Sequence, residues 1–298
     1  MQRIVDGIAY EGKYLEGAFN VRVWEANGHR EISARRVIEW TEIGPAPDWS
    51  HLAEMTEEER KARDEADKEE RKARNREANA MRAKTACRRF IKVMGFNEMA
   101  TLTYRENQTD EALAKVHFTK WARRMEHLIP GFAYCAGFEP QQRGAWHVHA
   151  AIYKLPEYVE MKKRMPSGEW RVFKVRGRDI GTVVWRSIVG KDNGLCFIGG
   201  KKKFTRSPAK IAAYVSKYIT KHYELVPEGK KRYTHSEGAE VPEVVREQFV
   251  GLSLLELIPR CFWLDDGSVI VSHHVGRWSD SYYLCTESVG PDIGEVSC

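Results

Sequence analysis

The sequence lacks most of the features that mark secreted, disulfide-stabilised or membrane proteins. Its six cysteines are widely spread and form no CxxC pair, which argues against a disulfide framework or a four-cysteine zinc site. No apolar h-region follows the N-terminal methionine, and no apolar run approaches the ~20 residues that span a bilayer. These absences predict a cytoplasmic protein with reduced thiols and no membrane partner.

The chain also lacks a strong net charge. Its 298 residues carry 48 Lys and Arg against 42 Asp and Glu, a formal charge of +6. This balance is compatible with a polyanionic partner without demanding one. The distribution is more informative, because basic residues gather in the last third of the chain: Lys201, Lys202, Lys203, Arg206, Lys210, Lys217 and Lys221.

Composition divides the chain into four segments. Residues 1–50 predict short strands and turns, and residues 51–84 form a connector rich in Ala, Glu, Lys and Arg, with high helix propensity. This connector is either a solvated helix or an arm that contacts DNA. Residues 85–235 have a globular pattern, and residues 236–298 form an extension without an interpretable motif.

The globular segment predicts an α+β fold, with a central antiparallel sheet flanked by helices. Strands are expected at 99–104, 132–139 and 146–153, and hairpin-like strands within 170–205. Helices are expected at 109–128 with Thr109 as N-cap, at 156–164, and from Ser207 to about His222.

The strand at 146–153 carries two histidines with one residue between them. Residues two apart on a strand share a face, so His147 and His149 point the same way and can bind one divalent cation. A tight turn at 140–144 would bring Glu139 against His147 as the third ligand, and a carboxylate favours Mg²⁺ or Mn²⁺ over zinc. The alternatives are a hydrogen-bonded histidine pair and a solvated carboxylate.

The helix after Ser207 carries two tyrosines and two lysines on one side. At 100° per residue, an arc of about 100° contains Tyr214, Lys217, Tyr218 and Lys221. The apolar stripe occupies another arc, so the phenols are expected to face a cleft. Each could act as a nucleophile assisted by an ammonium group, or the tyrosines could only pack while the lysines neutralise phosphates.

Other basic residues complete the candidate DNA-binding set. Arg143 could bind a phosphate bidentately beside the metal, or it could be a turn residue in solvent. The further candidates are Lys201, Lys202, Lys203, Arg206 and Lys210.

The two segments resemble the HUH endonucleases, and more closely the two-tyrosine rolling-circle replication initiators of single-stranded DNA bacteriophages. The resemblance rests on His147-Val148-His149, on Tyr214 and Tyr218 four apart among lysines, and on Thr101-Leu102-Thr103-Tyr104, which is similar to the family's first motif. Glu139 and the turn before the histidines also fit. The resemblance covers roughly residues 85–235.

The resemblance implies a metal-dependent nuclease and strand transferase that nicks single-stranded origin DNA, with a hairpin at the origin. One tyrosine would form a 5′-phosphotyrosine, the free 3′-OH would prime a host polymerase, and the second tyrosine would allow rejoining. No GxxxxGK[ST] motif is present, so a host helicase would unwind the DNA. The implied location is the host bacterial cytoplasm.

Two other classes stay open at this stage. A relaxase or transposase of the same superfamily would share the chemistry. A non-catalytic binder of single-stranded nucleic acid would hold the backbone with basic residues and stack bases on Tyr214, Trp185 or Phe204.

Overall fold

The computed structural model describes residues 1–46, 56–199, 207–221, 231–263, 268–276 and 281–288. The chain folds into two compact units. One comprises residues 73–241, and the other comprises residues 1–72 together with 242–298. The second unit is thus built from both ends of the sequence, which the composition alone had treated as separate segments. Among the described helices, none is long and apolar enough to cross a membrane.

The unit of residues 73–241 is an α+β layer structure, as predicted. Its five-stranded sheet has the order β10-β5-β6-β4-β9, and every pair is antiparallel. The strands of this sheet are β4 (Glu98–Tyr104), β5 (Tyr134–Pro140), β6 (Trp146–Ile152), β9 (Gly194–Ile198) and β10 (Tyr233–His235).

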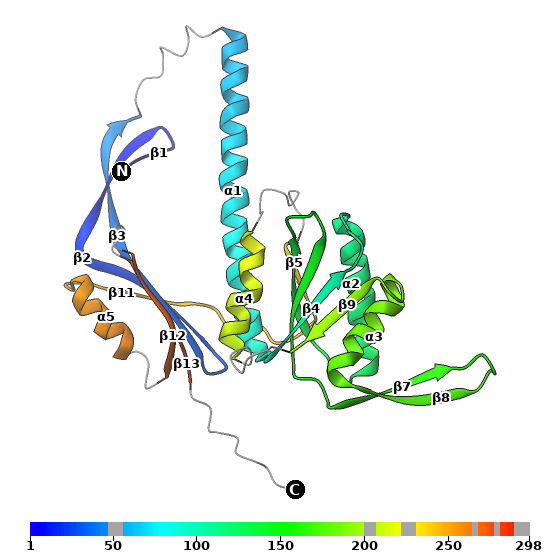
Figure 1. Ribbon diagram of the computed structural model, residues 1–298. Coiled ribbons are helices and arrows are strands. Elements are labelled where there is room, and N and C mark those ends of the chain that lie inside the picture. The colour runs from blue at the N-terminus through cyan, green and yellow to red at the C-terminus, as the bar shows by residue number, and fades with distance from the viewer. Residues whose placement is uncertain (47–55, 200–206, 222–230, 264–267, 277–280, 289–298) are drawn as a thin grey trace. The chain divides into compact units, whose positions relative to one another are not determined.

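Helices cover both faces of this sheet (Figure 1). On one face, α2 (Glu111–Leu128) and α3 (Gly177–Val189) pack around Phe118, Trp121 and Trp185. On the other face, α4 (Pro208–Thr220) packs with the end of α1 (Glu57–Met94). The two layers explain why β6 is buried along almost its whole length.

The charged connector is helical, as predicted, but the helix continues to Met94. Its first half is almost entirely exposed, and its first pair at i,i+4 is Glu57 with Lys61 at 2.8 Å. The later residues Cys87, Phe90 and Ile91 enter the core of the 73–241 unit. The solvated part therefore ends where apolar residues first recur at helical spacing.

Three predicted elements of this unit are wrong. Residues 158–164 form a strand, β7, that pairs with β8 (Trp170–Arg176), because Val159 and Met161 alternate toward the core. The region expected to form only hairpin-like strands contains α3. Its glycine Gly181 lies on β9, where a Cβ would meet Cys196 Sγ at 2.7 Å. The N-cap of α2 is Asp110, whose side chain accepts from the Leu113 N–H at 3.1 Å.

The other unit contains a six-stranded antiparallel sheet with the order β1-β2-β3-β13-β12, and β11 also pairs with β2. The expected short N-terminal strands are two long ones, β2 with 19 residues and β3 with 17. A core around Phe19, Ile32 and Leu284 joins the sheet to the only helix that the described residues add to it, α5. The elements are β1 (Gln2–Val5), β2 (Ile8–Ala26), β3 (His29–Pro45), β11 (Val245–Phe249), α5 (Leu254–Trp263), β12 (Val269–Gly276) and β13 (Ser281–Glu287).

The described cysteines Cys87, Cys135, Cys196, Cys261 and Cys285 are free and buried. The Sγ atoms of Cys87 and Cys135 lie 3.5 Å apart. Cys298 is outside the described residues.

Candidate active site

The two histidines lie on the central strand β6, between β5 and β4. Val148 and Ala150 point into the core beneath α2, so His147 and His149 face the α4 layer on the opposite side. Both imidazoles are almost completely buried, with 9% and 5% of their surface exposed. Strand periodicity thus places them as the sequence predicted.

Glu139 stands directly across the ladder from His147. The turn between β5 and β6 closes through a hydrogen bond from the Gln141 N–H to the Ala145 carbonyl at 2.8 Å. Gly144 in this turn has a φ of 83°, which a glycine adopts without strain. The predicted turn therefore aligns the carboxylate with the histidine face.

His149 contacts three neighbours that fix its ring. Its Nε2 lies 3.0 Å from Glu139 Oε2, and its Nδ1 lies 3.4 Å from Thr101 Oγ1 on β4. The ring of Tyr218 stacks on it, with centroids 4.3 Å apart and an interplanar angle of 11°. Burial lowers the pKa of His149, which the hydrogen bond to Glu139 partly opposes.

His147 keeps one nitrogen available. Its Nδ1 lies 3.0 Å from Gln141 Nε2, whereas its Nε2 is buried and has no hydrogen-bond partner among the described residues. Burial, with smaller contributions from His149 and Arg143, lowers the pKa of His147 to about 4. The imidazole is therefore neutral at pH 7 and retains a lone pair for a metal.

Glu139 also binds α4 through a short ion pair between its Oε1 and Lys221 Nζ. Burial alone would raise the pKa of Glu139, but the hydrogen bonds from Lys221 and His149 outweigh it and the net pKa is lowered. Glu139 is thus a carboxylate at neutral pH. It joins the histidine strand to the tyrosine helix.

The tyrosine helix brings its side chains together, but the prediction that both phenols face a cleft is wrong. Tyr218 is buried, with 6% exposed, because it lies over His149 in the interface between α4 and the sheet. Tyr214 is the accessible one, with 38% exposed. The two rings are 5.3 Å apart at 76°.

Electrostatics separate the two phenols further. Lys217 Nζ lies 4.4 Å from the ring centroid of Tyr214 and 4.8 Å from that of Tyr218. Burial and the hydrogen bond with Tyr214 raise the pKa of Tyr218 far above that of a free phenol. Tyr218 is therefore the poorer nucleophile in this arrangement.

The structure places only part of the predicted DNA-binding set. Arg143 is exposed and donates to the Tyr104 carbonyl at 3.1 Å, so it braces the turn against β4 while its charge acts on His147. Lys210 is exposed on the first turn of α4. Trp185 is fully buried and donates to the Thr103 carbonyl, so it cannot stack on a base. Lys201, Lys202, Lys203, Phe204 and Arg206 lie outside the described residues.

The donor chemistry of the site fits a divalent cation. Two neutral imidazoles and one carboxylate lie on one face, and the orphan Nε2 of His147 is a buried polar atom that needs a partner. Across the parts of the chain that the structure describes, however, no three His, Cys, Asp or Glu side chains already form a closed cation site. Glu139 is instead engaged by Lys221 and His149.

Two supporting residues were not singled out from the sequence. Gln141 and Thr101 each approach the outer nitrogen of one histidine. Strand register would have found Thr101, since it stands opposite His149 on β4. Such partners orient metal ligands and set the tautomer of the imidazole.

Residues 97–223 match the model of a family of replication-associated proteins of the ORF2 type. The matched segment runs from β4 to α4 and contains both histidines and both tyrosines. This match confirms the resemblance to replication initiators at the level of the family and supports a replication-associated role with DNA as partner. No match was found among curated proteins or among solved structures.

The metal-free protein is expected to lose stability as the pH falls from about 6.5 to about 4. The folded-state pKa of His147 lies below its unfolded value of 6.5, so the unfolded chain binds more protons in this window. Urea midpoints measured by circular dichroism in the presence of a chelator would give the profile. His147→Asn should flatten it, whereas the exposed His127→Ala should not; an unchanged slope in His147→Asn would contradict the assignment.

Proposed function

We propose that the chain is a rolling-circle replication initiator that nicks single-stranded origin DNA and rejoins it through phosphotyrosine intermediates. The observation that carries this proposal is the stacking of Tyr218 on His149, with Tyr214 beside it and Lys221 on Glu139. This contact joins the two predicted motifs in one site. A protein that only binds nucleic acid has no need for this combination.

Tyr214 is the first nucleophile in this proposal, because it is the exposed phenol and lies beside Lys217. Its oxygen attacks the scissile phosphorus, and the bond from phosphorus to the 3′ oxygen breaks. The proton lost by the phenol is balanced by the proton gained at the 3′ oxygen. The products are a 5′-phosphotyrosine and a free 3′-OH, which primes a host polymerase.

Lys217 and Lys221 stabilise the charge that develops on the phosphate and favour ionisation of the phenol. His147, His149 and Glu139 would hold Mg²⁺ or Mn²⁺, for which Glu139 would exchange its bond to Lys221. The bound cation would supply Lewis-acid polarisation of the scissile phosphate. Release of Lys221 from Glu139 would place its ammonium group at the disposal of the DNA.

Tyr218 takes the second turn of the reaction. After one round of synthesis it would cut the regenerated origin, and the new 3′-OH would attack the phosphotyrosine at Tyr214 and close a circle. The bond energy stays in the ester, so joining needs no nucleotide. The expected setting is a bacterial host cytoplasm, with a host helicase to unwind a hairpin-containing origin.

The test is covalent capture of DNA by the full-length chain. The protein is incubated with Mn²⁺ or Mg²⁺ and end-labelled single-stranded oligonucleotides that tile both strands of the replicon encoding it. A denaturing gel should show one oligonucleotide attached to the protein through its 5′ product. Absence of an adduct with every oligonucleotide, alongside retained binding, would instead support a non-catalytic binder.

A further inference from the structure

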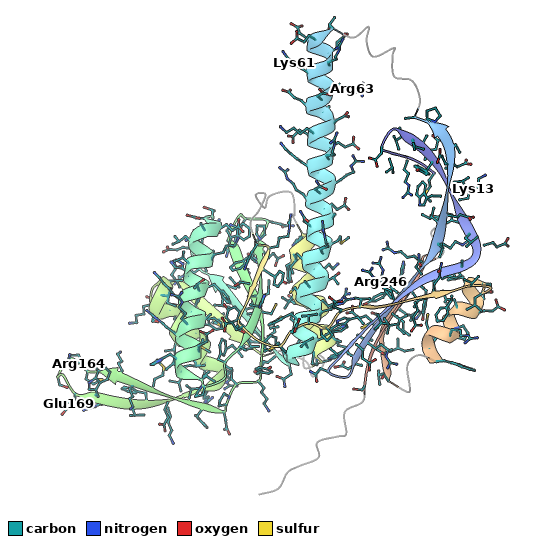
Figure 2. All side chains as sticks on the ribbon, turned by 180° about the vertical axis from the view of Figure 1, so that it is seen from behind. Lys13, Lys61, Arg63, Arg164, Glu169 and Arg246 are labelled. Carbon is teal, nitrogen blue, oxygen red and sulfur yellow. The ribbon has the colours of Figure 1, made fainter. Side chains whose placement is uncertain are left out.

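We infer that the hairpin β7–β8 is a ribbon arm that inserts into the major groove of duplex DNA next to the nick site. The inference rests on the proposed function for its DNA partner. The arm comprises β7, residues 158–164, and β8, residues 170–176, which pair only with each other among the described strands. Figure 2 shows it extending away from the rest of its unit, with Arg164 and Glu169 at the outer end.

The base of the arm is fixed in the core of the 73–241 unit. Val159 is buried there, and Met161 and Val175 pack against the same cluster. Gly177, which follows β8, donates to the Glu157 carbonyl at 2.8 Å. A Cβ at Gly177 would collide with the Pro156 carbonyl, so the chain passes closest at this point. These contacts set the direction of the arm before any partner binds.

The arm carries six basic side chains and one acidic one in its strands. Glu160 pairs with Lys174 at 3.9 Å, and at the turn Glu169 pairs with Arg171 at 3.7 Å. In the described part of the chain, no carboxylate pairs with Lys162, Lys163 or Arg176. The arm therefore presents an excess of positive charge to solvent.

The charges lie on both faces of the ribbon. The register pairs Lys163 with Arg171 on one face, while Lys162 and Arg164 project from the other. A single strand would follow one face only, whereas the walls of a major groove present phosphates to both. A major groove about 12 Å wide admits a two-stranded ribbon.

The outer part of the arm also exposes apolar surface that the core does not use. Trp170 is 68% exposed, and it stands opposite Arg164 at the end of the paired strands. An aromatic ring can contact thymine methyl groups and base edges in the groove. Basic residues would thus position the arm on the backbone, and Trp170 would contact the bases.

The test compares two triple variants of the full-length chain with equal loss of charge. The arm variant is Lys162→Gln/Lys163→Gln/Arg171→Gln, and the control is Lys120→Gln/Arg123→Gln/Lys191→Gln, at exposed positions of the same unit outside the arm. Binding is measured by fluorescence anisotropy in chelator. The probes are a hairpin with an arbitrary stem of about 15 base pairs, or one and a half turns, and an unpaired strand of equal composition.

For the arm variant, the slope of log affinity against log salt on the hairpin should become shallower by about 2–3. The unpaired strand should show little change, and the control variant should behave like the wild type. Equal losses on both probes, equal losses in both variants, or an unchanged slope would each overturn the inference.

The outcome is separable from that of the nicking proposal. Adduct formation on a short unpaired oligonucleotide that contains the nick site should stay unchanged in the arm variant. Failure of the wild type to form any adduct would reject the nicking proposal, while the binding comparison would still decide the role of the arm.

Discussion

The double variant Tyr214→Phe/Tyr218→Phe is expected to form no covalent adduct with DNA under conditions in which the wild type does. Phenylalanine keeps the ring that stacks on His149 and removes only the two hydroxyls, so the fold should persist. Without a phenol, the 5′ phosphate has no acceptor on α4. Adducts on a denaturing gel, with unchanged circular dichroism, measure the effect.

The single variants should differ from each other. Tyr214→Phe should slow the first cleavage by at least about tenfold, because the remaining phenol is buried and its pKa is raised, and each unit lowers the phenolate fraction tenfold. Tyr218→Phe should retain first cleavage and lose circle closure. Tyr153→Phe, a tyrosine of the same unit outside the site, serves as the control. The reverse ranking would refute Tyr214 as the first nucleophile.

His149→Ala is expected to reduce cleavage by about 1,000-fold while binding of single-stranded DNA persists. Loss of this ligand removes Lewis-acid stabilisation worth several kcal/mol, and each 1.36 kcal/mol is tenfold in rate. Single-turnover cleavage and anisotropy on the same oligonucleotide separate the two effects. Raising the Mn²⁺ concentration should recover part of the lost rate.

The matched control for this prediction is His127→Ala, an exposed histidine near the end of α2. It should leave both cleavage and binding unchanged. Parallel loss of cleavage and binding in His149→Ala would point to collapse of the stack with Tyr218, and hence to a structural role for the histidine. The melting temperature would confirm which of these holds.

The sequence predicted the elements that carry one strong periodicity. The histidine strand and the tyrosine helix were both found, because a buried strand and an apolar helical stripe each repeat at a fixed spacing. Their register was also accessible, since a short turn leaves Glu139 only one place opposite His147. The elements that failed, β7 and α3, have patterns interrupted by charge or glycine.

The position of Tyr218 could not be predicted from helical geometry alone. Helical spacing ranks side chains around one helix, but it does not say how wide the surface beneath the helix is. Here β6 offers an imidazole that covers the phenyl ring, so the buried stripe is wider than its aliphatic members. The orphan Nε2 of His147 likewise depends on three strands meeting α4.

The sheet of the other unit was also beyond prediction, because its strands meet across most of the chain. β3 pairs with β13, and no local pattern in residues 29–45 indicates a partner at 281–287. Only β2 and β3 are neighbours in sequence, and they were the strands whose alternation was visible.

The interruption of that sheet by residues 73–241 has a consequence for synthesis. The nuclease-like unit is one continuous stretch, so it can fold as soon as it leaves the ribosome. The edge of β3 must wait for β13 while the 235 residues between Pro45 and Ser281 are made. At about 5–20 residues per second this takes on the order of 10–50 s. During that interval an unpaired strand edge is open to wrong partners, and a chaperone would have most to protect there.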